Sequence, residues 1–158
     1  RCLLRPCGIR RGLLLHLDAS VIISILQGAP EAEGYLAAIE TTESAGKKLF
    51  TSSISRFEAA SVLAVQRFRG RQANHASDED LAQAEELVDD FLREVGCRDI
   101  LISEGIGRSA FEAWRKYGRL TGHPAQLTMS DCYAYACAKG YHVRMLATGQ
   151  RFAQTDLR

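Results

Sequence analysis

Three acidic residues stand where the sequence passes into a predicted helix. Asp18 ends the apolar run at residues 13–17, and Glu58 lies just after a second short apolar run at residues 49–52. Asp131 lies at the start of a segment of small apolar residues, 130–139. A helix N-terminus favours negative charge because the helix dipole is positive there. If these helix starts share one edge of a sheet, the carboxylates of Asp18, Glu58 and Asp131 converge.

Converging carboxylates point to a particular chemistry. They repel one another, so that one of them takes up a proton or a cation lies between them. Oxygen ligands without neighbouring Cys or His suit Mg²⁺ or Mn²⁺. Such an ion lowers the pKa of bound water and neutralises a phosphate group. The pattern therefore predicts hydrolysis of phosphodiester bonds, with Asp18, Glu58 and Asp131 as metal ligands.

Each acid also has a purely structural interpretation. Ser55 and Glu58 have the spacing of a capping box, in which the two side chains satisfy free amides at a helix start. Ser130 with Asp131, and Asp18 alone, could likewise act as helix caps. Taken singly, these interpretations stay open, and only the joint placement of the three acids favours a functional site.

The hydrophobic pattern predicts the elements that would position these acids. Strands alternate with helices, which favours an α/β fold with a mainly parallel sheet of four or five strands and helices on both faces. The predicted strands lie within residues 13–17, 49–52, 99–103 and 142–147. Helical spacing places Phe111 and Trp114 on the inner face of a helix over residues 106–117. It also predicts an apolar stripe on a helix over residues 55–70, formed by Phe57, Ala60, Leu63, Ala64 and Phe68.

Length and composition set the wider limits. The chain has 158 residues, which predicts a single domain over residues 13–158, preceded by a basic and disordered extension over residues 1–12. The leucine run after this extension is too short to span a membrane, which needs about 20 apolar residues. The five cysteines show no metal-binding spacing, which favours the reducing cytoplasm.

The charge balance bears on nucleic-acid binding. The formal net charge is +1, so the surface as a whole is not the basic surface that binds polyanions. Local contacts with phosphate remain open for a group of arginines, with ordinary solvated surface as the alternative: Arg56, Arg67, Arg69 and Arg71.

Four ordered motifs carry a resemblance to a known family. They are LDAS at residues 17–20, SxxSxxEA at 52–59, LxxSDCxAYAxA at 127–138 and LATGxxFxxTDL at 146–157. Together they resemble the motifs of the PIN-domain ribonucleases, specifically the VapC toxins of toxin–antitoxin pairs. The resemblance covers nearly the whole chain, and the last two motifs are the more specific.

The resemblance implies a site and partners. The family's metal-binding acids fall on Asp18, Glu58 and Asp131, and Ser20 is an auxiliary polar group beside the first. The terminal pair Thr155-Asp156 matches residues that order the edge of the site in the family. The resemblance also implies dependence on Mg²⁺ or Mn²⁺, cleavage of tRNA or ribosomal RNA, homodimerisation, and inhibition by a cognate antitoxin in a hetero-oligomer.

Two residues depart from the family pattern. Ser130 replaces the usual Gly before the third acid, and Arg151 stands where an acid normally precedes Phe152. Arg151 has several open interpretations: an ion pair with Asp131 or Asp156, a contact with an RNA phosphate, or exposure to solvent. A fixed cation here would weaken or remove one metal position. The alternative function is therefore a weakened or inactive PIN domain that binds antitoxin or RNA.

Overall fold

A four-stranded parallel sheet forms the centre of the part of the chain that the structure describes. The computed structural model describes residues 14–70 and 74–157. Within them the strand order is β3-β2-β1-β4, and all neighbouring strands are parallel. The strands are β1 (Leu14–Leu17), β2 (Lys48–Ser52), β3 (Arg98–Ile100) and β4 (Arg144–Leu146). The prediction of an α/β fold with a parallel sheet is confirmed.

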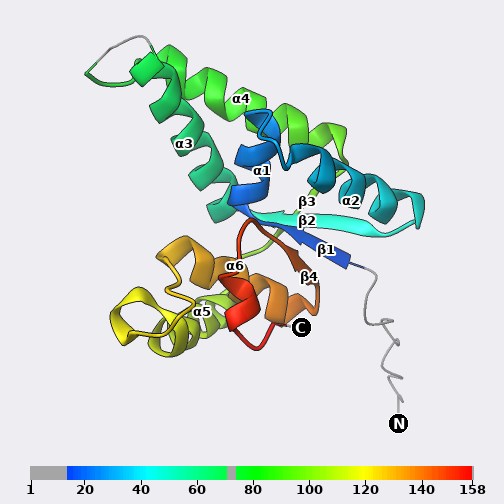
Figure 1. The fold of residues 1–158 in the computed structure, drawn as a ribbon, viewed down its shortest axis with the longest axis vertical. Helices are drawn as coiled ribbons and strands as arrows, with labels where there is room; N and C mark the ends of the chain where they lie inside the picture. The colour runs from blue at the N-terminus through cyan, green and yellow to red at the C-terminus, as the bar shows by residue number, and fades with distance from the viewer. Residues whose placement is uncertain (1–13, 71–73, 158) are drawn as a thin grey trace.

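Helices cover both faces of this sheet, as predicted (Figure 1). One face carries α1–α4 and the other carries α5 and α6. In the described ranges, no helix combines the length and the apolar character needed to cross a bilayer. The helices are α1 (Ala19–Leu26), α2 (Ala32–Ser44), α3 (Ser53–Gly70), α4 (Asp78–Glu94), α5 (Glu104–Tyr117) and α6 (Met129–Tyr141), with the short 3₁₀ helices η1 (Arg119–Thr121) and η2 (Phe152–Gln154). The extension predicted over residues 1–12 lies outside the described residues.

The order of the strands creates a reversal beside β1. From β1 the chain moves outward through β2 to β3, and it then returns to the opposite side of β1 to form β4. The segment after β1 enters α1 on one face, whereas Phe152, after β4, packs in the cluster on the other face. In open parallel sheets, ligands bind beyond the carboxyl ends of the strands at such a reversal. The fold thus favours a site where β1 and β4 end.

The inner faces of two helices differ from the prediction. Phe57, in the apolar stripe predicted for α3, is 76 % exposed. Phe111 is 64 % exposed and Trp114 43 %, so the prediction that these two residues point inward is wrong. The buried face of α5 consists mainly of smaller residues, including Ala110 and Ala113, which pack in the same cluster as the alanines of α6. Helical periodicity predicts the position of the buried face only to within about one residue. Ala110 and Ala113 are the sequence neighbours of Phe111 and Trp114, so a shift of one residue exchanges the buried and the exposed positions.

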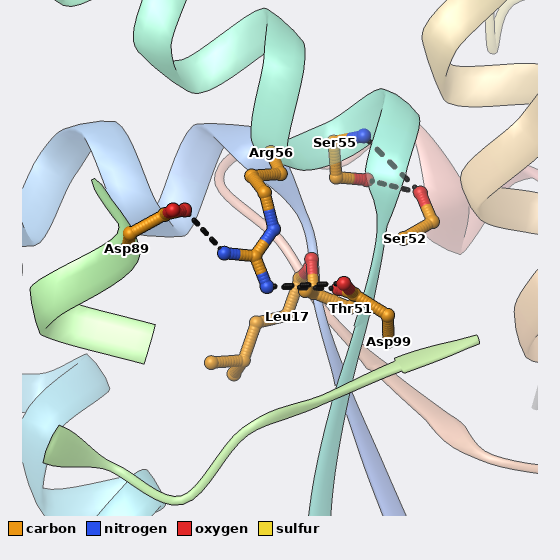
Figure 2. A network of polar contacts seen from close by, with 7 residues as sticks. All are labelled: Leu17, Thr51, Ser52, Ser55, Arg56, Asp89 and Asp99. Carbon is orange, nitrogen blue, oxygen red and sulfur yellow. Dashed lines mark hydrogen bonds and ion pairs between the residues drawn. The ribbon is translucent and has the colours of Figure 1, made fainter. Parts of the chain in front are cut away.

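Arg56 joins three elements instead of facing solvent (Figure 2). Its guanidinium donates to Asp89 on α4 and to both carboxylate oxygens of Asp99 on β3, the latter at 3.0 and 3.1 Å. Arg67 donates to Gln83 on α4. These contacts stabilise the packing of α3, so Arg56 is a poor candidate for a phosphate contact. Arg71 lies outside the described residues.

His16 is fully buried in the middle of β1. Its strand neighbours Phe50 and Met145 pack against the cluster of α5 and α6, and neither of its ring nitrogens has a hydrogen-bond partner among the described residues. Burial lowers the pKa of His16 from 6.5 to about 4. The folded protein therefore holds this imidazole neutral at pH values where the unfolded chain protonates it.

We expect acid to destabilise the protein through His16. As the pH falls from 6.5 to about 4, the unfolded state gains a proton that the folded state cannot bind, so the free energy of unfolding drops by about 3 kcal/mol. His16→Leu should remove this part of the loss, as measured by urea unfolding at pH 7 and pH 4.5. The exposed His75, changed to Leu, is the control. An equal acid-induced loss in wild type and His16→Leu would contradict the prediction.

Candidate active site

Asp18 lies at the carboxyl end of β1 and is 4 % exposed. Its backbone N–H donates to the carbonyl of Leu146 at 3.0 Å, which fixes the residue between β1 and β4. Its side chain caps α1, because Oδ2 accepts hydrogen bonds from the backbone N–H of Ser20 at 3.1 Å and from the Ser20 hydroxyl at 2.5 Å. The capping interpretation of Asp18 is thus confirmed, and it is compatible with a place in the site.

Ser20 connects Asp18 to the segment after β4. Its hydroxyl donates to Asp18 and accepts from the backbone N–H of Thr148 at 3.0 Å. The side chain thereby holds together the two chain segments that meet at the reversal of the sheet. Thr148 belongs to the pocket wall and was not predicted as a site residue, since only the fold brings it to α1.

Asp131 lies in the first turn of α6 and is 7 % exposed. It forms a capping box with Thr128: Asp131 Oδ2 accepts from the Thr128 N–H at 2.8 Å, and Thr128 Oγ1 accepts from the Asp131 N–H at 3.1 Å. The N-cap residue is Thr128, so the capping interpretation of Ser130 with Asp131 is confirmed for Asp131 and wrong for Ser130. The spacing T-x-x-D was visible in the sequence and is a capping signal in its own right.

The direction of α6 explains why Asp131 belongs to this edge. α6 ends at Tyr141, just before β4 begins at Arg144, so the helix runs back along the sheet to the start of that strand. Its N-terminus must therefore lie near the carboxyl ends of the strands. Unlike Asp18, Asp131 does not directly follow a strand, because α5 and η1 separate it from β3.

Glu58 lies on α3 and is half-buried. The helix begins at Ser53, directly after β2, so that Glu58 is in its second turn and not its first. The backbone N–H of Ser55 donates to the Ser52 hydroxyl at 3.1 Å, which makes Ser52 the capping residue. The predicted capping box of Ser55 and Glu58 is therefore wrong, and the side chain of Glu58 is not committed to the helix start.

The three carboxylates influence one another electrostatically. Burial raises the pKa of Asp18, and the charge of Asp131 raises it further, against the hydrogen bonds from Ser20. Burial also raises the pKa of Glu58, as do the charges of Asp18 and Asp131, whereas a hydrogen bond with Ser130 and the charge of Arg151 lower it. Both raised pKa values indicate a site that gains stability from an added cation.

Arg151 reaches Asp131 from the segment after β4. Its Nη1 donates to Asp131 Oδ2 at 3.1 Å, which confirms the ion pair with Asp131, whereas the contact with an RNA phosphate stays a prediction. Both hydrogen bonds to Asp131 side-chain oxygens go to Oδ2. The ion pair lies at a pocket of about 270 Å³ whose lining includes Asp18, Ser20, Asp131, Thr148 and Arg151.

The donor set fits Mg²⁺ or Mn²⁺ in its chemistry, because the site offers carboxylate and hydroxyl oxygens and no sulfur or imidazole. Within residues 14–70 and 74–157, however, no three acidic, His or Cys side chains lie close enough together to form a ready-made metal site. Asp18, Glu58 and Asp131 share an edge of the sheet, and side-chain movement would have to bring them onto one ion.

Thr155 and Asp156 fasten the end of the described chain to α6. The Tyr135 hydroxyl donates to Asp156 Oδ1 at 2.5 Å, and Lys139 Nζ donates to Oδ2 at 3.3 Å. The hydrogen bond from Tyr135 is the main reason that the pKa of Asp156 falls to about 2. Thr155 Oγ1 donates to the carbonyl of Phe152 at 2.6 Å. Neither residue lines the pocket, so any effect on the site is through the position of the segment that carries Arg151.

Comparison with known proteins agrees with this geometry. Residues 15–157 match the PIN domain family. The chain belongs to this family. It is similar to a VapC ribonuclease of Rhizobium meliloti (strain 1021), with 34 % identity over 141 residues that cover 89 % of this chain and 97 % of the relative. Ribonucleases VapC28 and VapC42 of Mycobacterium tuberculosis are 30 % and 29 % identical over 89 % and 90 % of this chain, and over 93 % and 95 % of their own lengths.

We expect Ser20→Ala to destabilise this PIN domain by about 1–2 kcal/mol, because the change leaves the Thr148 N–H without its partner and removes a hydrogen bond to Asp18. The free energy of unfolding in urea measures the effect. Ser24→Ala, on the same helix, is the matched control: Ser24 Oγ is buried and has no partner among the described residues, so its loss should leave stability unchanged or raise it. Equal effects of the two changes would refute a bridging role for Ser20.

Proposed function

We propose that the protein is a metal-dependent endoribonuclease that hydrolyses phosphodiester bonds in tRNA or ribosomal RNA. The observation that carries the proposal is the arrival of Asp18, Glu58 and Asp131 at one edge of the sheet from three separate helices. The similarity covers nearly the whole length of the relatives that are named VapC ribonucleases, which supports the same activity here.

Asp18, Glu58 and Asp131 would hold Mg²⁺ or Mn²⁺ in this proposal. The bound ion supplies an activated water and compensates charge on the scissile phosphate. Ser20 and Thr128 keep Asp18 and Asp131 in place through hydrogen bonds, and Ser130 holds Glu58. Burial and the neighbouring carboxylates raise the pKa values of Asp18 and Glu58, and a bound cation would act in the opposite direction on both.

The same proposal includes the biological setting. The protein acts as the toxin of a toxin–antitoxin pair, forms a homodimer, and is neutralised in the cytoplasm by a cognate antitoxin in a hetero-oligomer. The kinship with VapC ribonucleases supports these partners. The unpaired thiols of Cys97, Cys132 and Cys137 are compatible with a reducing compartment.

One observation favours a second candidate function. The guanidinium of Arg151 is paired with Asp131, which is one of the three proposed ligands. If this ion pair remains intact when Mg²⁺ or Mn²⁺ is present at millimolar concentration, Asp131 is not free to bind the ion. The domain then binds antitoxin or RNA but does not cleave RNA. The two functions differ in one measurable property, which is metal-dependent turnover.

The decisive experiment is cleavage of a mixed tRNA and ribosomal RNA pool by the purified chain without antitoxin. We expect cleavage with Mg²⁺ or Mn²⁺ and none with chelator. Asp18→Asn, Glu58→Gln and Asp131→Asn should each reduce the rate by roughly 100-fold or more, since each removes a charged ligand. Asn at position 18 can still cap α1, so this variant should fold.

Asp90→Asn is the control, because Asp90 is an exposed acid on α4 that pairs only with Arg93 among the described residues. Its activity should equal that of the wild type. A folded wild-type protein that cuts no RNA with either ion would reject the nuclease and favour the binding module. Cleavage that survives all three substitutions would reject the proposed site.

A further inference from the structure

Arg151 provides positive charge to the proposed metal site from within the chain. It is the partner of Asp131 at 3.1 Å, and its charge also lowers the pKa of Glu58. In the described parts of the chain, no other ion pair involves Asp18, Glu58 or Asp131. The guanidinium is therefore a component of the site and not a neighbour of it.

The charges of these four residues limit how many metal ions the site can hold. When ionised, the three carboxylates and the guanidinium together leave two negative charges uncompensated, which equals the charge of one divalent cation. A second divalent ion would give the site an excess of positive charge, close to a guanidinium that cannot lose its proton. Asp18 and Asp131 are almost fully buried, so water screens a charge at their carboxylates only weakly, although it screens the half-exposed Arg151 side chain more.

The exposure of Arg151 suits a role toward substrate. Its side chain is 52 % exposed, whereas that of Asp131 is 10 % exposed. Only Nη1 of the guanidinium donates a hydrogen bond within the described residues. Arg151 lines the pocket, and its other N–H groups have no hydrogen-bond partner among the described residues, so they are available to a phosphate oxygen, for which a guanidinium is well suited.

We propose that Arg151 takes the place of a second metal ion: the site binds one divalent cation per chain, and the Arg151 guanidinium supplies the second positive charge to the phosphate. This inference rests on the proposed function. It extends that function by specifying the metal stoichiometry and by giving a substrate contact to Arg151, one of the two residues that depart from the family pattern.

The test counts Mn²⁺ ions bound to the purified chain without antitoxin, by electron paramagnetic resonance and calorimetric titration. Wild type should bind one ion per chain, and Asp131→Asn should weaken this binding at least tenfold. Arg151→Asp replaces a cation with a carboxylate and should allow a second ion to bind. Arg151→Met removes the charge alone, and we expect it to bind a single ion at least tenfold more tightly than wild type.

Arg108→Asp is the matched control. Arg108 also forms an ion pair with a carboxylate, that of Glu104, but it lies on the exposed surface of α5. The substitution changes the net charge of the protein as much as Arg151→Asp does. We expect one bound Mn²⁺ with unchanged affinity, because the change lies outside the site.

The outcomes separate this inference from the proposed function. Two ions in the wild type, or a single ion in Arg151→Asp, would overturn the inference, and RNA cleavage by the wild type would still support the nuclease. Unchanged affinity in Arg151→Met would also overturn it. No ion in the wild type but binding in Arg151→Asp would show that Arg151 blocks the site, which overturns the inference and favours the binding module.

Discussion

The site depends on a carboxylate that the fold keeps buried at the end of its central strand. Asp18 is 4 % exposed, and its backbone is fixed between β1 and β4. Burial of a charge is costly unless hydrogen bonds, a helix N-terminus or a cation compensate it. α1 and Ser20 supply the first two kinds of compensation. The raised pKa of Asp18 indicates that this compensation is incomplete, which leaves a role for a metal ion.

The parallel topology determines what surrounds Asp18. Because the chain returns past β1 to form β4, the segment with Thr148 and Arg151 comes to lie beside a residue more than a hundred positions earlier. α6 contributes Asp131 for the same reason, since the helix must run back to the start of β4. The contacts of Asp156 with Tyr135 and Lys139 fasten the end of this segment to α6, although the residues that line the pocket end at Phe152.

Arg151 changes the charge of the site through its ion pair with Asp131. A guanidinium at this position compensates Asp131 before any metal binds, which reduces the repulsion among the carboxylates. A divalent ion that binds to Asp131 must compete with Arg151 for this carboxylate. The affinity for the metal therefore depends on the strength of the ion pair between Arg151 and Asp131. The same fold is therefore compatible with both proposed functions, the nuclease and the binding module. Which of the two applies depends on the strength of the ion pair between Arg151 and Asp131.

The sequence by itself determined the α/β class, the strand positions to within a few residues, and the places of Asp18 and Asp131 at helix starts. These features depend on signals within a few residues, such as apolar runs and the capping of α1 by Asp18. Only the tertiary structure decided the partner of Arg151, the position of Glu58 in the second turn of α3, and the outward direction of Phe111. An ion pair across 20 residues, or the choice between neighbouring helix faces, depends on which elements pack together, and no local pattern contains that information.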